Sequence, residues 1–315
     1  MLLCAPAGND LPFDEALCEQ GRNFSNKIWN SLKLIKGWKV TKCKQPESSK
    51  QAIIWLENKI DKAINEINDS FSKYRISQAL MCIYKLVWDD FCSWYLEIIK
   101  PKYGSPIDFT SYNATINQLE KILKLLHPFM PFISEEIWHL LRQRKEDIIV
   151  SKWPESSNFD NLLLKEFEQS KKVISAIRTL RKEQSISNKN ELVLEEIRHK
   201  KNNYNFNEII IKLGNLSSIN TISEKPSSSF SFMVDANEFF IPLNNTVDTE
   251  SQIQKLEKEL EYNNGFLKSV EIKLNNKKFI NKAPKQVVEN EKNKMRDIKS
   301  KIKILTEKII SIKGY

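Results

Sequence analysis

Hydrophobic residues recur at helical spacing through the first half of the chain. Apolar side chains three and four positions apart predict helices over residues 14–36, 53–71, 76–99, 116–126 and 132–141. The third of these is apolar nearly all round, which is typical of a helix at the centre of a bundle. Because the connections are short, the five helices predict an α-helical bundle.

The pattern changes after Trp153 and Pro154. One more long helix is predicted there, and shorter elements follow it. The predicted elements are a helix over 162–181, a strand over 192–197, a short helix over 206–213, a strand over 217–222, and a hairpin of strands 230–234 and 238–243. This second part of the chain therefore indicates a small α+β unit.

The last third of the chain carries two heptad series of apolar residues. One series runs from Ile253 to Leu274 and the other from Val288 to Ile312. The two series match in reverse order, which is what an antiparallel pair requires. Leu274 then faces Val288, and Pro284 begins the second helix. The sequence predicts a helical hairpin with its turn near residue 281; a parallel dimer is the alternative.

Charge is concentrated on this hairpin. The chain of 315 residues has 49 Lys+Arg and 40 Asp+Glu, and residues 250–315 alone hold 16 basic and 9 acidic residues. Lysines surround Phe279 at the turn, and an aromatic ring beside phosphate-binding lysines is typical of nucleic-acid binding. A solvated coiled-coil surface is the alternative for any single lysine. For the cluster, we expect an anionic partner, and RNA suits a long thin arm.

Motifs of common catalytic sites are missing from the sequence. There is no Gly-rich phosphate loop, no HExxH and no GxSxG, and packing or capping explains His127 and His139 better than metal ligation does. Glu135 and Glu136 follow a helix start, where acidic side chains complement the helix dipole. We therefore expect no catalytic residues, no metal and no cofactor. Five widely spaced cysteines favour a reducing cytoplasm, and no apolar run is long enough to cross a membrane.

Several motifs, taken in order, resemble a known family. They are GRNFSNKIWN at 21–30, DDFCSWYLEIIKP at 89–101, HPFMPFISEEIW at 127–138, SKWP at 151–154, AIRTLRKE at 176–183 and FINKAPKQVVENEK at 279–292. Together they resemble the C-terminal part of the bacterial valyl-tRNA synthetases over essentially the whole chain. The leucyl and isoleucyl relatives share the early motifs. The terminal arm points to valine, because an isoleucyl relative is expected to end in a cysteine-rich zinc module.

The resemblance implies a mainly α protein in four parts. Residues 1–13 would link to a catalytic domain, 14–154 would form the anticodon-binding bundle, 155–247 an α+β connector and 248–315 a coiled-coil tRNA-binding arm. The catalytic and editing domains of the family, with their ATP and Mg²⁺, lie outside this sequence. The resemblance therefore implies a fragment of an ATP-dependent valine–tRNA ligase that is inactive alone, is cytoplasmic and monomeric, and binds valine tRNA.

The resemblance also suggests which side chains contact tRNA. Arg22 and Lys33, in a region that also holds Lys27, Lys36 and Lys39, would contact the anticodon stem-loop. Arg178 and Arg181 would pair with phosphates, or else with acidic side chains of the bundle. Phe279 would stack on a base pair of the tRNA elbow or close the turn of the arm. The remaining predicted contacts to the elbow are Lys277, Lys278, Lys282 and Arg296.

Two other functions fit the same sequence. One is a protein-interaction scaffold that dimerises through the coiled coil, with a basic tip that has no role. The other is a general RNA-binding protein that does not distinguish tRNAs by their anticodon.

Overall fold

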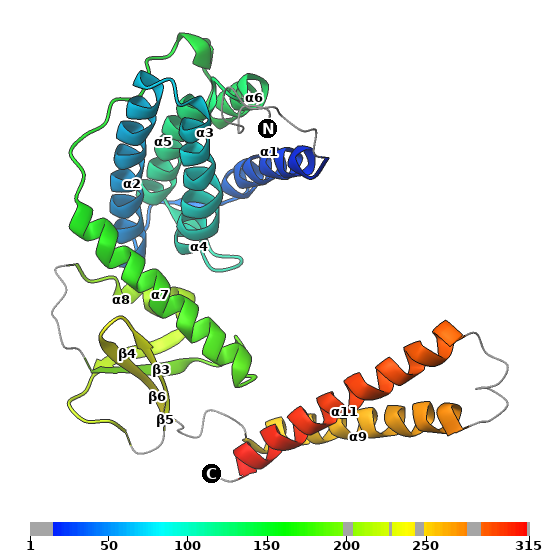
Figure 1. The fold of residues 1–315 in the computed structure, drawn as a ribbon. Coiled ribbons are helices and arrows are strands. Elements are labelled where there is room, and N and C mark those ends of the chain that lie inside the picture. The colour runs from blue at the N-terminus through cyan, green and yellow to red at the C-terminus, as the bar shows by residue number, and fades with distance from the viewer. Residues whose placement is uncertain (1–14, 198–203, 227–228, 243–248, 276–284, 314–315) are drawn as a thin grey trace. The chain divides into compact units, whose positions relative to one another are not determined.

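The computed structural model describes residues 15–197, 204–226, 229–242, 249–275 and 285–313 (Figure 1). The chain divides into two compact units, residues 1–242 and 243–315. Each unit is described by itself.

The first unit begins with the helical bundle that the sequence predicts. Its long helices lie side by side in Figure 1, and the mainly α fold class is confirmed. The α-helices of the bundle are α1 (Glu15–Lys36), α2 (Glu47–Ser72), α3 (Ile76–Lys85), α4 (Leu96–Ile99), α5 (Phe109–Leu126) and α6 (Pro131–Leu141), and a short 3-10 helix, η3 (Ile148–Val150), follows α6.

The run from α3 to α4 is continuous but is not α-helical throughout. Its middle ten residues, η2 (Leu86–Tyr95), form a π-helix, in which each turn takes one extra residue. The apolar pattern predicts the helix, but it does not predict the wider turn. Asp90 of η2 is buried, and its carboxylate lies 3.1 Å from the Lys171 amine.

A two-stranded parallel pair joins the end of α1 to the start of α5. Strand β1 (Val40–Thr41) pairs with β2 (Ile107–Asp108), and the amide of Ile107 donates to the carbonyl of Lys39 at 2.8 Å. The side chain of Asp108 then caps α5 by accepting from the amide of Ser111 at 2.8 Å. This pair was not predicted: residues 41–50 read as a polar loop.

The α+β part contains one long helix and a four-stranded sheet. Helix α7 (Asn161–Glu183) begins at Asp160, whose side chain accepts from two amides of the first turn. The other elements are β3 (Leu192–Ile197), α8 (Asn207–Gly214), β4 (Leu216–Thr221), β5 (Ser229–Val234) and β6 (Asn237–Pro242), and the sheet order is β4-β3-β6-β5. Strands β3 and β4 are parallel, and the connection between them contains α8. Strands β5 and β6 form the predicted hairpin.

One hydrophobic core runs through this unit, from Phe24 to Ile241. At its centre the ring of Trp55 stacks on that of Phe167, 4.1 Å between centroids, and both side chains are fully buried. Because Trp55 belongs to α2 and Phe167 to α7, the bundle and the α+β part are held together by the same apolar contacts.

The second unit is the antiparallel helical hairpin that the heptads predict. Helices α9 (Thr249–Asn275) and α11 (Lys285–Lys313) run in opposite directions (Figure 1). Val270, Ile298, Leu305 and Ile309 are buried along the seam, together with the polar residues Asn263 and Glu291. Ion pairs Lys299–Glu271 and Lys301–Glu259, at 3.2 and 3.0 Å, cross between the helices.

Within the described residues, no helix combines the length and the apolar character that a membrane crossing needs.

Candidate nucleic-acid interface

Five lysines without an acidic residue among them lie at the end of α1 and just beyond it. We call this set, Lys33, Lys36, Lys39, Lys42 and Lys44, the basic strip. All five side chains are exposed. No ion pair or hydrogen bond occupies any of their amines within the described part of the chain. The strip is therefore a local excess of positive charge open to an anion.

Local structure fixes the strip to the bundle. Lys33 and Lys36 stand in the last turn of α1, where cations complement the helix dipole. Gly37 ends the helix with its amide bonded to the Lys33 carbonyl at 3.0 Å. The half-buried Trp38 then packs on the core, and β1 holds the following residues against β2. The backbone under these lysines is thus held in place, although the side chains are free.

The β1–β2 pair also brings a second segment next to the strip. Residues 101–106 lead into β2, which is bonded to Lys39 through Ile107. Gly104 has a φ of +77°, which a tight turn there requires, and the amide of Ser105 bonds the Lys102 carbonyl at 2.9 Å. Tyr103 stands fully exposed on this turn, beside the exposed Lys102. An unpacked aromatic ring with an exposed lysine as its neighbour suits stacking on a nucleotide base.

The other basic residues of α1 are engaged with the protein. Lys27 lies 4.1 Å from the centre of the Trp88 ring and bonds the Ser93 hydroxyl at 3.2 Å, so its amine is held on the bundle. Arg22 is exposed and forms an ion pair with Glu19 at 3.6 Å. Surface pairs of this kind are weak, and the predicted role of Arg22 in tRNA binding stays a prediction.

Arg178 and Arg181 lie on the same helix, but their surroundings differ. Arg178 is exposed, with its guanidinium 5.8 Å from the centre of the Trp94 ring. Arg181 is only 3% exposed and donates to the carbonyls of Ser187, Gly214 and Asn215 at 3.0, 3.0 and 2.9 Å. Burial lowers the pKa of Arg181, and its role is to tie α7 to the turns around it. The phosphate contact predicted for Arg181 is therefore wrong.

The predicted arm contacts are only partly covered by the structure. Lys277, Lys278, Phe279 and Lys282 lie outside the described residues. Arg296 is exposed on α11, within 3.5 Å of Glu289 and beside Asn293. Its predicted role stays a prediction.

A second charged region lies in the bundle, in a hollow between α2, α3, η2 and α7. Three of its four lysines are paired, whereas Lys85 has no ion pair within the described residues. Lys171 contacts Asp90 at 3.1 Å and Glu168 at 2.9 Å, and Lys59 lies 3.5 Å from Asp90. Because carboxylates neutralise these lysines, the hollow offers a phosphate less than the basic strip does.

Lys33, Lys36 and Lys39 were predicted from the sequence. The residues that were not predicted are Lys42 and Lys44 of the strip, and Lys102 and Tyr103 of the turn. Lys42 and Lys44 could have been predicted from the run of lysines without an acidic residue. No signal in the sequence showed that residues 101–106 lie beside it, because a two-residue strand pair has no usable hydrophobic period.

Comparisons with known proteins agree with this reading of the two units. Residues 54–196 match the family model described as the anticodon-binding domain of tRNA ligase. Residues 248–313 match the model described as the valyl tRNA synthetase tRNA binding arm.

Similar curated proteins carry the name valine–tRNA ligase. The chain is 47% identical to that of Christiangramia forsetii over 315 residues and 48% identical to that of Parabacteroides distasonis, covering 99% of this chain in both cases. It is 33% identical to that of Listeria innocua over 97% of this chain. The chain spans 36% of the length of each of these relatives.

Proposed function

Because the chain belongs to the valyl-tRNA synthetase family, we propose that it is a tRNA-recognition region with no chemistry of its own. The bundle would hold the anticodon stem-loop of valine tRNA and the hairpin arm its outer corner. Aminoacylation, which needs ATP and Mg²⁺, would be catalysed by a separate catalytic domain. We propose that the protein acts in the cytoplasm.

The basic strip is the observation that carries this proposal. It lies on the unit that contains the anticodon-binding match, its lysines are unpaired within the described residues, and Tyr103 is exposed on the turn that leads into β2, the partner of β1. Lysines that reach phosphates give affinity and position without reading sequence. A ring that stacks on an unstacked base adds contact to a loop, where tRNA bases are exposed. The combination fits an anticodon loop better than it fits a regular duplex.

A binding titration with a valine tRNA transcript over a salt series tests the proposal. Each phosphate contact contributes about 0.7–0.9 to the slope of log affinity against log salt, so Lys33→Gln/Lys36→Gln/Lys39→Gln should flatten the slope by about 2. The matched control, Lys50→Gln/Lys62→Gln/Lys73→Gln, removes the same charge from lysines that pair with Glu47, Glu66 and Asp69. Its slope should stay near that of the parent chain.

A transcript with a changed central anticodon base tests specificity. Weaker binding of this transcript by the parent chain would support recognition in the bundle. Equal binding of both transcripts would favour the general RNA-binding alternative. Equal slopes for the two triple variants would contradict the role of the strip.

A further inference from the structure

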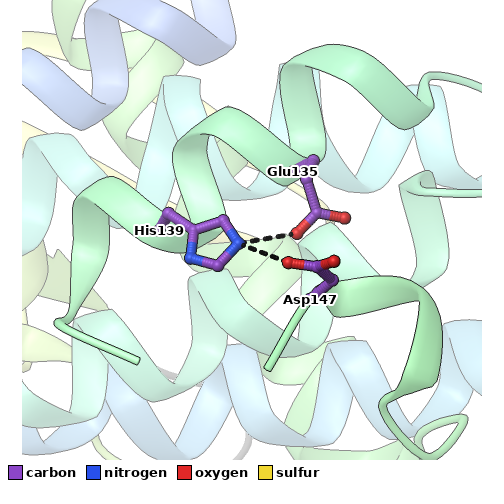
Figure 2. A group of neighbouring side chains, drawn as sticks. All are labelled: Glu135, His139 and Asp147. Carbon is purple, nitrogen blue, oxygen red and sulfur yellow. Dashed lines mark hydrogen bonds and ion pairs between the residues drawn. The ribbon is translucent and has the colours of Figure 1, made fainter. Parts of the chain in front are cut away.

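Three side chains that can ligate a metal converge at one end of the bundle (Figure 2). His139 Nε2 lies 3.1 Å from Glu135 Oε1 and 3.0 Å from Asp147 Oδ1. All three ligand atoms lie within 4.8 Å of one another. One ring nitrogen thus faces two carboxylates, although it can donate only one proton to them.

The fold holds these side chains in this arrangement from two directions. Glu135 and His139 are four residues apart on α6, so they stand on the same helix face. Asp147 lies just before η3, in the segment of residues 142–150 that follows α6, which we call the return segment. The amide of Ile148 donates to Glu135 Oε1 at 2.9 Å, which orients that carboxylate.

The return segment is fixed on the other side of Asp147 as well. Trp138 Nε1 donates to the carbonyl of Glu146 at 3.1 Å, and the Arg144 guanidinium lies 3.7 Å from the centre of the Trp138 ring. Arg144 in turn pairs with Glu120 of α5. Because its neighbours in the chain are anchored, Asp147 presents its carboxylate to α6 at little further entropic cost.

We propose that Glu135, His139 and Asp147 form a binding site for a divalent transition metal, Zn²⁺ in particular. The imidazole favours Zn²⁺ over Mg²⁺ or Ca²⁺, which prefer oxygen ligands alone. Zinc bonds of about 2.0–2.2 Å to nitrogen and oxygen place tetrahedral ligand atoms roughly 3.3–3.5 Å apart. The observed 3.0 and 3.1 Å from His139 need to open by a few tenths of an ångström, and the two carboxylate oxygens, which lie within 4.8 Å of each other, need to settle at the same spacing. The partly exposed side chains leave the fourth position to water.

In this site the metal takes the place of the proton on Nε2, and the ring keeps its proton on Nδ1. Two carboxylates balance the charge of the ion. Bound zinc would fasten the return segment of residues 142–150 to α6, a structural role in which no catalytic step is needed. No metal was expected here, because packing explained His139 in the sequence; Asp147, eight residues further along and outside the helix, is brought to it by the fold.

Calorimetric titration of the full chain with ZnCl₂ tests the site. Cys18 and Cys43 are exposed thiols that bind zinc themselves, so the titration uses a background in which both are serine. We expect one saturable site and a thermal midpoint that rises with zinc concentration. His139→Gln and Asp147→Asn should each weaken binding by about 100-fold or more, since loss of an outer-shell partner alone costs 10–100-fold.

Glu136→Gln is the matched control, because Glu136 adjoins Glu135 on the helix but is outside the cluster. It should bind zinc like the background chain. Asp147 is 63% exposed, so its replacement should leave the fold intact by circular dichroism. Absence of saturable binding at millimolar zinc would overturn the proposal, and so would binding that His139→Gln leaves unchanged.

Discussion

Replacing Arg181 should destabilise the protein far more than replacing Arg178, three residues earlier on α7. Both side chains are arginines on one helix, so helix propensity and charge change equally in Arg181→Met and Arg178→Met. The difference between the variants then reports the three carbonyl bonds of Arg181.

The size of the effect depends on which hydrogen bonds each carbonyl keeps after Arg181 is replaced. Ser187 O still accepts from the Asn190 amide at 3.1 Å, and Asn215 O from the Leu192 amide at 3.3 Å. For Gly214 O, Arg181 is the donor that the structure provides. Leaving one buried acceptor unsatisfied costs about 1–3 kcal/mol, and losing two further bonds about 1 kcal/mol each, so we expect a loss of about 3–5 kcal/mol.

Urea denaturation followed by tryptophan fluorescence measures this loss. With a urea m-value of about 3 kcal/mol per M, the midpoint of Arg181→Met should fall by about 1–1.7 M. Arg178→Met should stay within about 0.5 kcal/mol of the parent chain, as exposed substitutions do. A loss below 1 kcal/mol for Arg181→Met would refute the reasoning, because the guanidinium would then not be holding the turns.

Other predictions concern thiols, a lysine and the arm. Burial raises the pKa of Cys82 to about 12 and also raises the pKa of Cys92, whereas the thiols of Cys18 and Cys43 are exposed. Iodoacetamide at pH 8 should therefore modify Cys18 and Cys43 before Cys82 and Cys92, and equal labelling of all four would contradict this. Burial lowers the pKa of Lys212 to about 8, so the unfolded chain binds more protons between about pH 8 and 10.5. Stability should therefore rise across that interval, and less so in Lys212→Met, as urea midpoints at each pH would show. Glu291 is buried in the seam, and one of its oxygens has no partner within the described residues. Glu291→Leu should therefore raise the melting temperature of the arm helices. A lower melting temperature would show that the ion pair of Glu291 with Lys294 stabilises the arm more than burial of the carboxylate destabilises it.

The main elements of the fold were predictable because they follow apolar periods. Strand β3 was predicted with the bounds the structure gives, and the helices agree to within a few residues except α2 and α5, which begin six and seven residues earlier than their apolar patterns. In the first turn of α5 Phe109 is exposed, and the side chain of Asp108 caps the helix there. The π-helix and the β1–β2 pair left no periodic signal. Single-residue roles failed where a residue departs from its usual surroundings, as buried Arg181 does.

The distribution of charge shows why counting residues is a poor guide to a binding surface. The arm holds most of the net charge of the chain, but only part of that charge is free. Lys294, Arg296, Lys299 and Lys301 lie within 3.5 Å of a glutamate oxygen. The arm's exposed lysines without an ion pair in the described residues are Lys258, Lys268, Lys273, Lys292 and Lys303. The basic strip, by contrast, contributes five lysines in twelve residues with no acid among them. A phosphate that meets a paired lysine must compete with a carboxylate, whereas one that meets the strip displaces only water and mobile ions. The free charge of a surface, not its net charge, therefore sets how steeply its RNA binding depends on salt, and all five lysines of the strip should contribute to that dependence.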